Sequence, residues 1–187
     1  MAREKRRYSG QSFEDRQAER RARLVRAALD VAGRFGLEGT SVAAICAEAG
    51  LTARYFYESF PGRDAIFVEA YRLAQDELLE DIGEHIAPRD PVASALTGFF
   101  TVLADHPGPA RVFLLDLDDH GPQMKAASRE AGRKFAALFA PGVKDGPLLA
   151  GILGSILQIA KHWIASGFAE PVELVVATAV LFTKVGR

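Results

Sequence analysis

The residues best suited to chemistry lie in one short stretch, GLTARYFYESFPGRD, at positions 50–64. It contains two tyrosines, two phenylalanines and two arginines within fifteen residues. Arg54 can donate to base edges or phosphates, and the small Ala53 permits close approach to a DNA groove. The hydroxyls of Tyr55 and Tyr57 can reach phosphates. The pattern indicates a nucleic-acid contact; the alternative is that both tyrosines pack on neighbouring helices while the arginine is solvated.

Other residue patterns argue against catalysis and metal binding. The chain has no G-x-S-x-G, P-loop or G-x-G-x-x-G motif. Its four histidines lack HxxxH or HExxH spacing, and the single cysteine, Cys46, has no partner for a zinc site or a disulfide. Residues 116–121 resemble half of a calcium loop, but Pro122 and Ala127 break the pattern. We therefore expect no enzyme, no metal and no cofactor, and a reducing cytoplasmic location.

Positive charge is concentrated at the beginning of a chain whose net charge is −1. The first 26 residues carry nine Lys and Arg against four Asp and Glu, which indicates a polyanionic partner for that end; a solvated tail is the alternative. The first fifteen residues have no apolar core, so no signal peptide is expected. The longest apolar run, at positions 148–160, is too short to cross a bilayer, so no membrane partner is expected.

The elements that must position these residues are all helical, because no segment shows the sustained alternation of a strand. Apolar spacing and glycine or proline breaks predict about nine helices, at positions 16–35, 41–49, 52–58, 63–86, 91–105, 109–119, 122–140, 147–167 and 171–185. Gly50 and Leu51 give the second and third helices the short turn of a helix-turn-helix. Phe56 and Phe60, four residues apart, are expected to pack inward against the first helix, whose apolar stripe is predicted to include Phe35.

The last two predicted helices are apolar on almost every side, which requires burial on every side. Little chain remains to cover the final helix, so self-association through residues 147–185 is the simplest cover. The middle segments are rich in phenylalanine and leucine, which is compatible either with a ligand pocket or with an ordinary filled core.

From about residue 20 to residue 70, the order of residue types resembles the TetR family of transcriptional repressors. The matching residues are Ala27, Ala28, Phe35, Gly36, Thr40, Ser41, Val42, Ile45, Ala49, Gly50, Leu51, Thr52, Tyr57, Phe60, Arg63, Asp64 and Ile66. The resemblance implies an all-α fold with three parts: a basic arm at 1–15, a helix-turn-helix DNA-binding domain at 16–64, and an effector-binding and dimerisation domain at 65–187. It also implies a homodimer on a palindromic operator, acting as a repressor that a small apolar or aromatic effector releases.

The family's DNA contacts can be carried over to matching positions. Thr40 and Ser41, at the start of the second helix, are implied to bind phosphate, as helix N-termini do. Thr52 to Tyr57 match the recognition helix, with Tyr57 at the phosphate-contacting tyrosine. Arg63 stands where the family often has lysine, and its cationic role survives. Ala53 and Arg54 stand where the family often has Lys-Gly, so the base preference is not predictable.

The arginines from Arg3 to Arg23 resemble the basic arms that some members lay along the DNA backbone or in the minor groove. In the effector domain, the predicted ligand-binding residues are Phe99, Leu103, Phe113, Leu117, Phe135, Gln158 and His162. For His162 the alternative is a buried histidine with satisfied hydrogen bonds. The helix at 63–86 is expected to transmit ligand binding to the DNA-binding domain.

A different class of function also fits the composition. An all-helical small-molecule-binding or enzymatic domain could use its basic N-terminus to contact RNA or an anionic membrane. The helix-turn-helix spacing favours DNA. Sequence-specific and strongly salt-dependent DNA binding separates the two hypotheses, because the second predicts equal affinity for any polyanion.

Overall fold

The computed structural model describes residues 13–114 and 121–184, which form nine α-helices and no strand. The helices are α1 Phe13–Phe35, α2 Val42–Ala49, α3 Ala53–Ser59, α4 Arg63–His85, α5 Pro91–Asp105, α6 Pro107–Leu114, α7 Gly121–Phe139, α8 Gly146–Ala165 and α9 Val172–Thr183. The all-α prediction is confirmed, and the helix ends within the described ranges lie within three residues of those predicted. Residues 115–119 of the predicted sixth helix lie outside the described residues.

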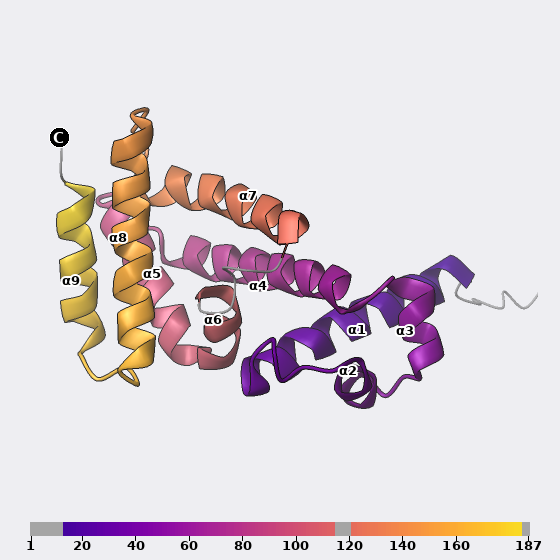
Figure 1. The fold of residues 1–187 in the computed structure, drawn as a ribbon. Coiled ribbons are helices and arrows are strands. Elements are labelled where there is room, and N and C mark those ends of the chain that lie inside the picture. The colour runs from indigo at the N-terminus through magenta and orange to yellow at the C-terminus, as the bar shows by residue number, and fades with distance from the viewer. Residues whose placement is uncertain (1–12, 115–120, 185–187) are drawn as a thin grey trace, which may run out of the picture.

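The first three helices form a unit at one end of the molecule (Figure 1). Phe56 and Phe60 on α3 are buried with their ring centroids 5.8 Å apart, as their spacing predicted. Ile45 on α2 is also fully buried in this core. Burying one such side chain stabilises the fold by about 1.5–3 kcal/mol, so these contacts fix α3 against α1 and α2.

Phe35 does not belong to this core, and its predicted place on the apolar stripe of α1 is wrong. Its side chain is 64% exposed. Phe35 is the last residue of α1, and the guanidinium of Arg34 lies 5.6 Å from the centroid of its ring. The turn that follows passes so close that a Cβ on Gly39 would lie 2.4 Å from the Phe35 carbonyl oxygen. The stripe therefore ends one turn earlier, at Val31 and Ala32.

Arginines of α1 hold the unit together. Arg21 donates to the carbonyl of Ser59 over 2.6 Å, pairs with Glu69 of α4, and lies 4.1 Å from the ring centroid of Phe60. Arg23 donates to the Ala49 carbonyl at the end of α2 over 2.6 Å. Both belong to the stretch that is predicted to form a DNA-contacting arm. In the structure these two side chains bond to backbone carbonyls of α2 and α3, and residues 1–12 of that arm lie outside the described residues.

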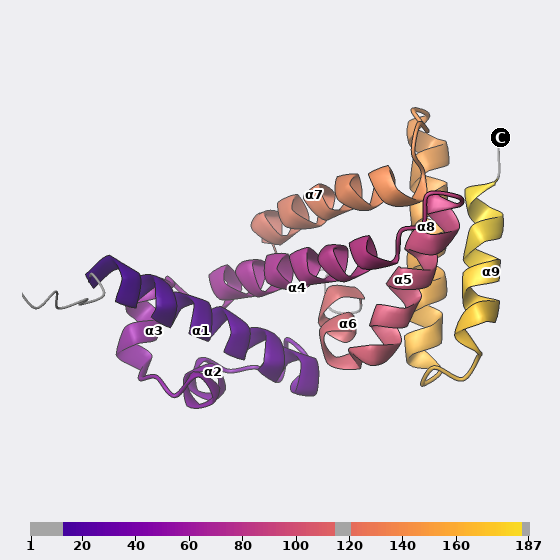
Figure 2. The same cartoon turned by 180° about the vertical axis from the view of Figure 1, so that it is seen from behind.

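The 23-residue helix α4 connects the N-terminal unit to the remaining helices (Figure 2). It packs against α1 on one side and against α5 and α7 on the other. Arg26 of α1 pairs with Glu77 of α4, which adds a polar contact to this packing. The short helix α6 contacts α1, α4, α5 and α8, so it lies between the N-terminal unit and the rest of the molecule.

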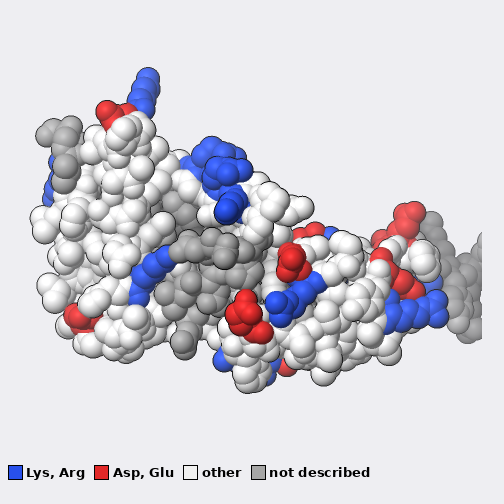
Figure 3. Space-filling model, viewed as in Figure 1, with Lys and Arg blue, Asp and Glu red and all other residues white. Residues whose placement is uncertain are grey.

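Helices α8 and α9 lie side by side at the far end and leave much of their apolar surface uncovered (Figures 1 and 2). The exposed fractions are 39% for Leu157, 57% for Leu174, 65% for Leu181 and 41% for Phe182. This end of the molecule carries few charged side chains (Figure 3). A surface this apolar normally marks an interface, so it supports the predicted self-association.

Helix α8 is also longer than the apolar run that was judged too short for a bilayer. It has 20 residues, and a window of mean hydropathy 1.4 makes it long and apolar enough to span a membrane by length and composition alone. Core helices pass the same test. Only 28% of that window is buried within one protomer, which again leaves apolar surface for a second copy to cover.

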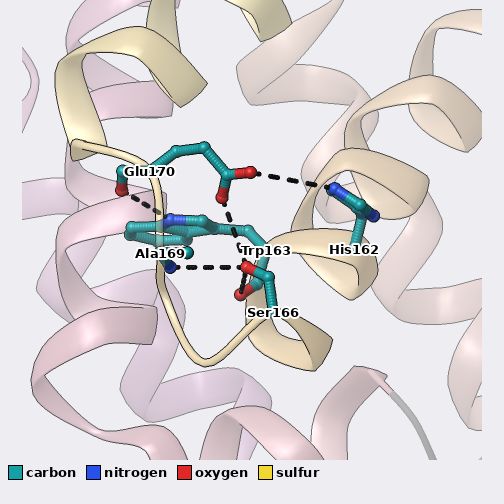
Figure 4. Close-up of polar contacts among 5 residues, drawn as sticks. All are labelled: His162, Trp163, Ser166, Ala169 and Glu170. Atoms are coloured by element: carbon teal, nitrogen blue, oxygen red, sulfur yellow. Dashed lines mark hydrogen bonds and ion pairs between the residues drawn. The ribbon is translucent and has the colours of Figure 1, made fainter.

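A polar network closes the corner between α8 and α9 (Figure 4). The indole Nε1 of Trp163 donates to the Glu170 carbonyl over 2.9 Å, and the hydroxyl of Ser166 donates to the Trp163 carbonyl over 2.8 Å. Gly167 and Phe168 turn the chain with φ angles of 72° and 61°. These bonds fix the direction in which α9 leaves α8, and so the shape of the apolar surface.

We expect Leu181→Glu to dissociate a dimer formed through this surface. In a two-fold interface each substitution counts twice, so the loss of about 3–6 kcal/mol raises the dissociation constant at least about a hundredfold. Sedimentation velocity at micromolar concentration measures it. Phe13→Glu is the matched control, because Phe13 is 67% exposed at the opposite end. If both variants sediment as the unmodified protein does, the surface is not the interface.

Candidate nucleic-acid interface

A tight turn joins α2 to α3. Gly50 adopts the left-handed conformation with φ 61°, and its N–H bonds to the Ala47 carbonyl. The following N–H, of Leu51, donates to the Cys46 carbonyl over 2.9 Å. These bonds satisfy the last carbonyls of α2 and redirect the chain, and glycine avoids the strain that a side chain would meet at this φ. The helix-turn-helix geometry follows from this cap.

Thr40 and Ser41 differ in what they expose. Ser41 is exposed and caps α2, accepting from the Ala44 N–H over 3.1 Å. Thr40 is fully buried, and its hydroxyl donates to the Gly36 carbonyl over 2.7 Å. The buried Thr40 side chain thus supports the turn before α2, and it offers no exposed surface for the predicted phosphate contact. Ser41 remains at the exposed helix N-terminus, where anions are favoured.

The first residues of α3 are open to solvent. Thr52 and Ala53 are both exposed. Thr52 occupies the N-cap position, yet its side chain makes no capping hydrogen bond. The exposed start of α3 therefore has no side-chain cap from Thr52, and an anionic group such as a phosphate could accept from its first N–H groups.

The two tyrosines of α3 have different surroundings. Tyr57 is 62% exposed and packs edge-on against Phe56, with ring centroids 5.3 Å apart. Tyr55 is half-buried, and the guanidinium of Arg20 lies 4.6 Å from its ring centroid. The alternative that both tyrosines pack on neighbouring helices thus describes Tyr55 in part and does not describe Tyr57.

Arg54 extends into solvent, with 84% of its side chain exposed. Its Nε donates to Glu58 over 2.9 Å, one helical turn later. This contact raises the pKa of the guanidinium, through the hydrogen bond first and the charge of Glu58 second. The guanidinium keeps other N–H donors, because an arginine carries five. Glu58 places a negative charge beside the Arg54 guanidinium, and this charge would repel a DNA phosphate.

Arg63 begins α4 and joins two parts of the unit. Its Nη1 donates to the Thr40 carbonyl over 3.3 Å, and its guanidinium lies 5.5 Å from the ring centroid of Phe67. The side chain is half-buried, so part of the guanidinium remains accessible beside Ser41's helix N-terminus. These contacts bring the predicted cation and the start of α2 together.

A cavity of about 140 Å³ lies among α4 to α8. Its lining consists of Tyr71, Phe99, Leu114, Ser128, Ala131, Gly132, Phe135, Phe139, Leu153, Ile156, Leu157 and Lys161. Phe135 and Phe139 are stacked at 5.6 Å with an interplanar angle of 24°, and Phe99 meets both at its edge. The cavity is therefore walled by aromatic rings.

The predicted ligand residues are spread over three places. Phe99 and Phe135 line the cavity, whereas Leu103 is buried at a separate cleft between α1, α4 and α6. Gln158 and His162 lie on the outer groove between α8 and α9, where His162 is 73% exposed and 3.9 Å from Glu170. Leu117 and the side chain of Phe113 lie outside the described residues.

Gln158 and His162 thus lie away from the aromatic cavity, and their ligand-binding role stays a prediction. Because α8 is apolar around its whole circumference, its inward face cannot be read from residue spacing. Sequence reasoning missed Tyr71, Ser128 and Lys161. Tyr71 is 2% exposed on α4, where a tyrosine among long apolar side chains was a signal for a buried hydroxyl. Burial raises the pKa of Tyr71, while contacts with Ser128 and Gln75 act against that rise. Its phenol stays protonated at neutral pH.

The family described as "Bacterial regulatory proteins, tetR family" has a sequence model that matches residues 24–70. The matched stretch contains most of α1, all of α2 and α3, and the start of α4, which is the unit whose geometry is described above. Over this stretch the chain is similar to the TetR family, as the sequence analysis predicts. The match identifies the unit formed by α1, α2 and α3 as similar to the DNA-binding part of these regulators.

Solved structures of similar proteins extend this likeness over the whole TetR-type fold. One is the transcriptional regulator FadR from Bacillus subtilis, in complex with stearoyl-CoA, at 16% identity, covering 89% of this chain and 98% of that one with a TM-score of 0.68. Another is the multidrug binding protein EbrR complexed with imidazole, at 20% identity, with coverage of 90% and 97% and a TM-score of 0.72.

A third is a TetR-like transcriptional regulator from Rhodococcus sp. RHA1, at 19% identity, with coverage of 89% and 94% and a TM-score of 0.64. At these identities the likeness concerns the fold. The comparison with curated protein sequences gave no match.

We expect Glu58→Gln to strengthen DNA binding several-fold at low salt, because it removes a charge that repels phosphate and frees the Nε of Arg54. The salt dependence should also steepen by about one phosphate contact. Gel-shift titration across a salt series, with DNA from upstream of the protein's own gene, measures both. Glu84→Gln on α4 makes the same change in net charge far from α3 and is the control. If the two variants bind DNA with equal affinity, the Arg54–Glu58 pair does not belong to the DNA interface.

Proposed function

We propose that this protein is a repressor of the TetR family that binds a palindromic operator as a homodimer and is released by a small apolar or aromatic effector. The proposal rests chiefly on the outer face of α3, where Thr52, Arg54 and Tyr57 are exposed while Phe56 and Phe60 fill the opposite face. A short helix with donors and a tyrosine on its free face suits a major groove flanked by phosphates.

In this proposal the DNA contacts are Ser41, Thr52, Ala53, Arg54, Tyr55, Tyr57 and Arg63. Arg54 is proposed to reach base edges, because 84% of its side chain is exposed and its donors are planar. Ser41, Tyr57 and Arg63 serve phosphates and so set the position of α3 rather than the sequence it reads. Binding to chromosomal DNA would place the protein in the bacterial cytoplasm.

The homodimer is proposed to form through α8 and α9, within residues 147–185. The exposed leucines of these helices would then be covered by the same surface of a second copy, as two-fold symmetry requires. Two recognition helices would face one side of a DNA duplex. The proposed domains remain a basic arm at 1–15, a DNA-binding domain at 16–64 and an effector domain at 65–187.

The effector is proposed to bind in the aromatic cavity, and α6 offers a short route from there to DNA. Leu114, at the end of α6, lines the cavity. Gly108, at its beginning, lies against Gly33 of α1: a Cβ on Gly33 would lie 2.9 Å from the Gly108 carbonyl carbon. A ligand that moves Leu114 would therefore move backbone that touches the DNA-binding unit, in addition to any motion through α4.

The proposal predicts sequence-specific binding that a conservative change at α3 weakens. Protein titrated on DNA from upstream of its own gene should bind far more tightly than on unrelated DNA or RNA of equal length, with strong salt dependence. Tyr57→Phe should reduce operator affinity about five- to tenfold, because one hydrogen bond to a charged phosphate is lost, and should leave the dimer intact. Equal affinity for every polyanion would favour the RNA or membrane alternative.

The contact between α1 and α6 gives a second prediction. Gly33→Ala should weaken operator binding at least about fivefold without ligand, because the added methyl group pushes α6 away as an effector would. Gly83→Ala on α4 is the matched control: it brings the same gain in helix propensity, and no atom lies within 4 Å of its added Cβ. Gel-shift titration measures the affinity. Unchanged affinity of the Gly33 variant, with its fold intact by circular dichroism, would contradict this route.

A further inference from the structure

The arginines of α1 differ in whether the protein supplies acceptors for their N–H groups. Arg21 and Arg23 donate to backbone carbonyls of α3 and α2. Arg26 and Arg34 pair with carboxylates of α4 and α2. Within the described part of the chain, the side chain of Arg20 makes a contact with an aromatic ring and makes no hydrogen bond or ion pair. Its charge is therefore not used for holding neighbouring helices by polar bonds.

The ring that Arg20 contacts belongs to the recognition helix. Its guanidinium carbon lies 4.6 Å from the ring centroid of Tyr55, and both side chains are half-buried. The attraction between a cation and an aromatic face comes from the charge distribution of the ring and leaves the N–H donors without an acceptor. An arginine carries five such donors, so the guanidinium is held in place while its donors stay available to a ligand.

A neighbouring contact fixes the backbone that carries Arg20. The next residue, Arg21, donates to the Ser59 carbonyl over 2.6 Å and lies 4.1 Å from the ring centroid of Phe60. Helix α1 is therefore tied to the C-terminal end of α3, while Tyr55 lies nearer the start of α3. An arginine held by its backbone and by a ring loses less conformational freedom on binding than a free surface arginine does.

The location of Arg20 indicates which acceptor it meets. Tyr55 directly follows Arg54, which lies on the exposed face of α3 that is proposed to enter the major groove. Arg20 belongs to α1, against which the opposite face of α3 packs, so its donors lie at the side of α3. The groups beside a recognition helix in the major groove are phosphates. A phosphate also matches a planar guanidinium, which can donate two N–H groups to it.

We propose that Arg20 is a phosphate contact of the DNA-binding unit and that the Tyr55 ring is the platform that orients it. This inference rests on the proposed function, because it adds a residue of α1 to the same DNA interface. It also gives Tyr55 a role that belongs to its ring and is separate from any contact made by its hydroxyl.

The phosphate contact is tested by removing the Arg20 charge. Arg20→Ala should weaken DNA binding about five- to tenfold at low salt and lower the salt slope by about one for each bound protomer. Gel-shift titration across a salt series, with DNA from upstream of the protein's own gene, measures both. Arg133→Ala, at an exposed position of α7, is the control for the loss of one positive charge. An unchanged salt slope in Arg20→Ala would overturn the proposal, because a merely structural role changes affinity without changing the number of phosphates contacted.

The platform is tested by exchanging the ring at position 55. Tyr55→Leu should weaken DNA binding about as much as Arg20→Ala, and the double variant should bind within about twofold of either single variant. Tyr55→Phe keeps the ring, so adding Arg20→Ala to it should still cost about five- to tenfold. If the losses of Tyr55→Leu and Arg20→Ala multiply in the double variant, the ring does not orient the arginine. Circular dichroism checks the fold, and Tyr55→Met replaces Tyr55→Leu if that variant does not fold.

The same titrations separate this inference from the regulator itself. If the unmodified protein binds neither the upstream DNA nor any duplex enriched from a random-sequence library, the proposed function fails. If the unmodified protein binds specifically and Arg20→Ala binds with the same affinity and salt slope, the proposed function stands while the role of Arg20 is wrong.

Discussion

The burial of Phe56 and Phe60 is the constraint on which the DNA-binding unit depends. These two rings occupy one face of a seven-residue helix, too short to be stable by itself. Their packing, with Arg21 bonded to the Ser59 carbonyl at the end of that helix, decides which side of α3 faces outward. Arg54 and Tyr57 are exposed because the two phenylalanines are not. The interface is thus a consequence of core packing.

The arginines of α1 also stabilise the DNA-binding unit. Arg21, Arg23, Arg26 and Arg34 bond to carbonyls or carboxylates of α2, α3 and α4, so much of the basic charge near the N-terminus stabilises the unit. Exposed ion pairs such as these contribute about 0–1 kcal/mol each, and their larger effect is geometric. They hold the C-terminal ends of α2 and α3 and the body of α4 against α1, and the proposed phosphate contacts Ser41 and Arg63 lie at the opposite, N-terminal ends of α2 and α4.

The cavity and the DNA-binding unit are linked through two helices, and each of these helices contacts both. Helix α4 packs on α1 and carries Tyr71 to the cavity; α6 touches α1 at Gly33 and reaches the cavity at Leu114. A backbone contact without intervening side chains is stiff, since packed groups cannot yield without a shift of a whole helix. At the far end, α8 lines the cavity on its inner face, and exposed apolar side chains of α8 and α9 form the proposed dimer surface.

The sequence alone determined the helix positions, the inward face of α3 and the helix-turn-helix. The reason is that the spacing of apolar residues and the glycine or proline breaks are local signals. Tertiary structure alone decided four assignments. Thr40 turned inward and Phe35 outward, since each lies at a helix end where periodicity no longer specifies a direction. His162 lies outside and Lys161 at the cavity, since a helix that is apolar all round has no readable inner face until its neighbours pack against it.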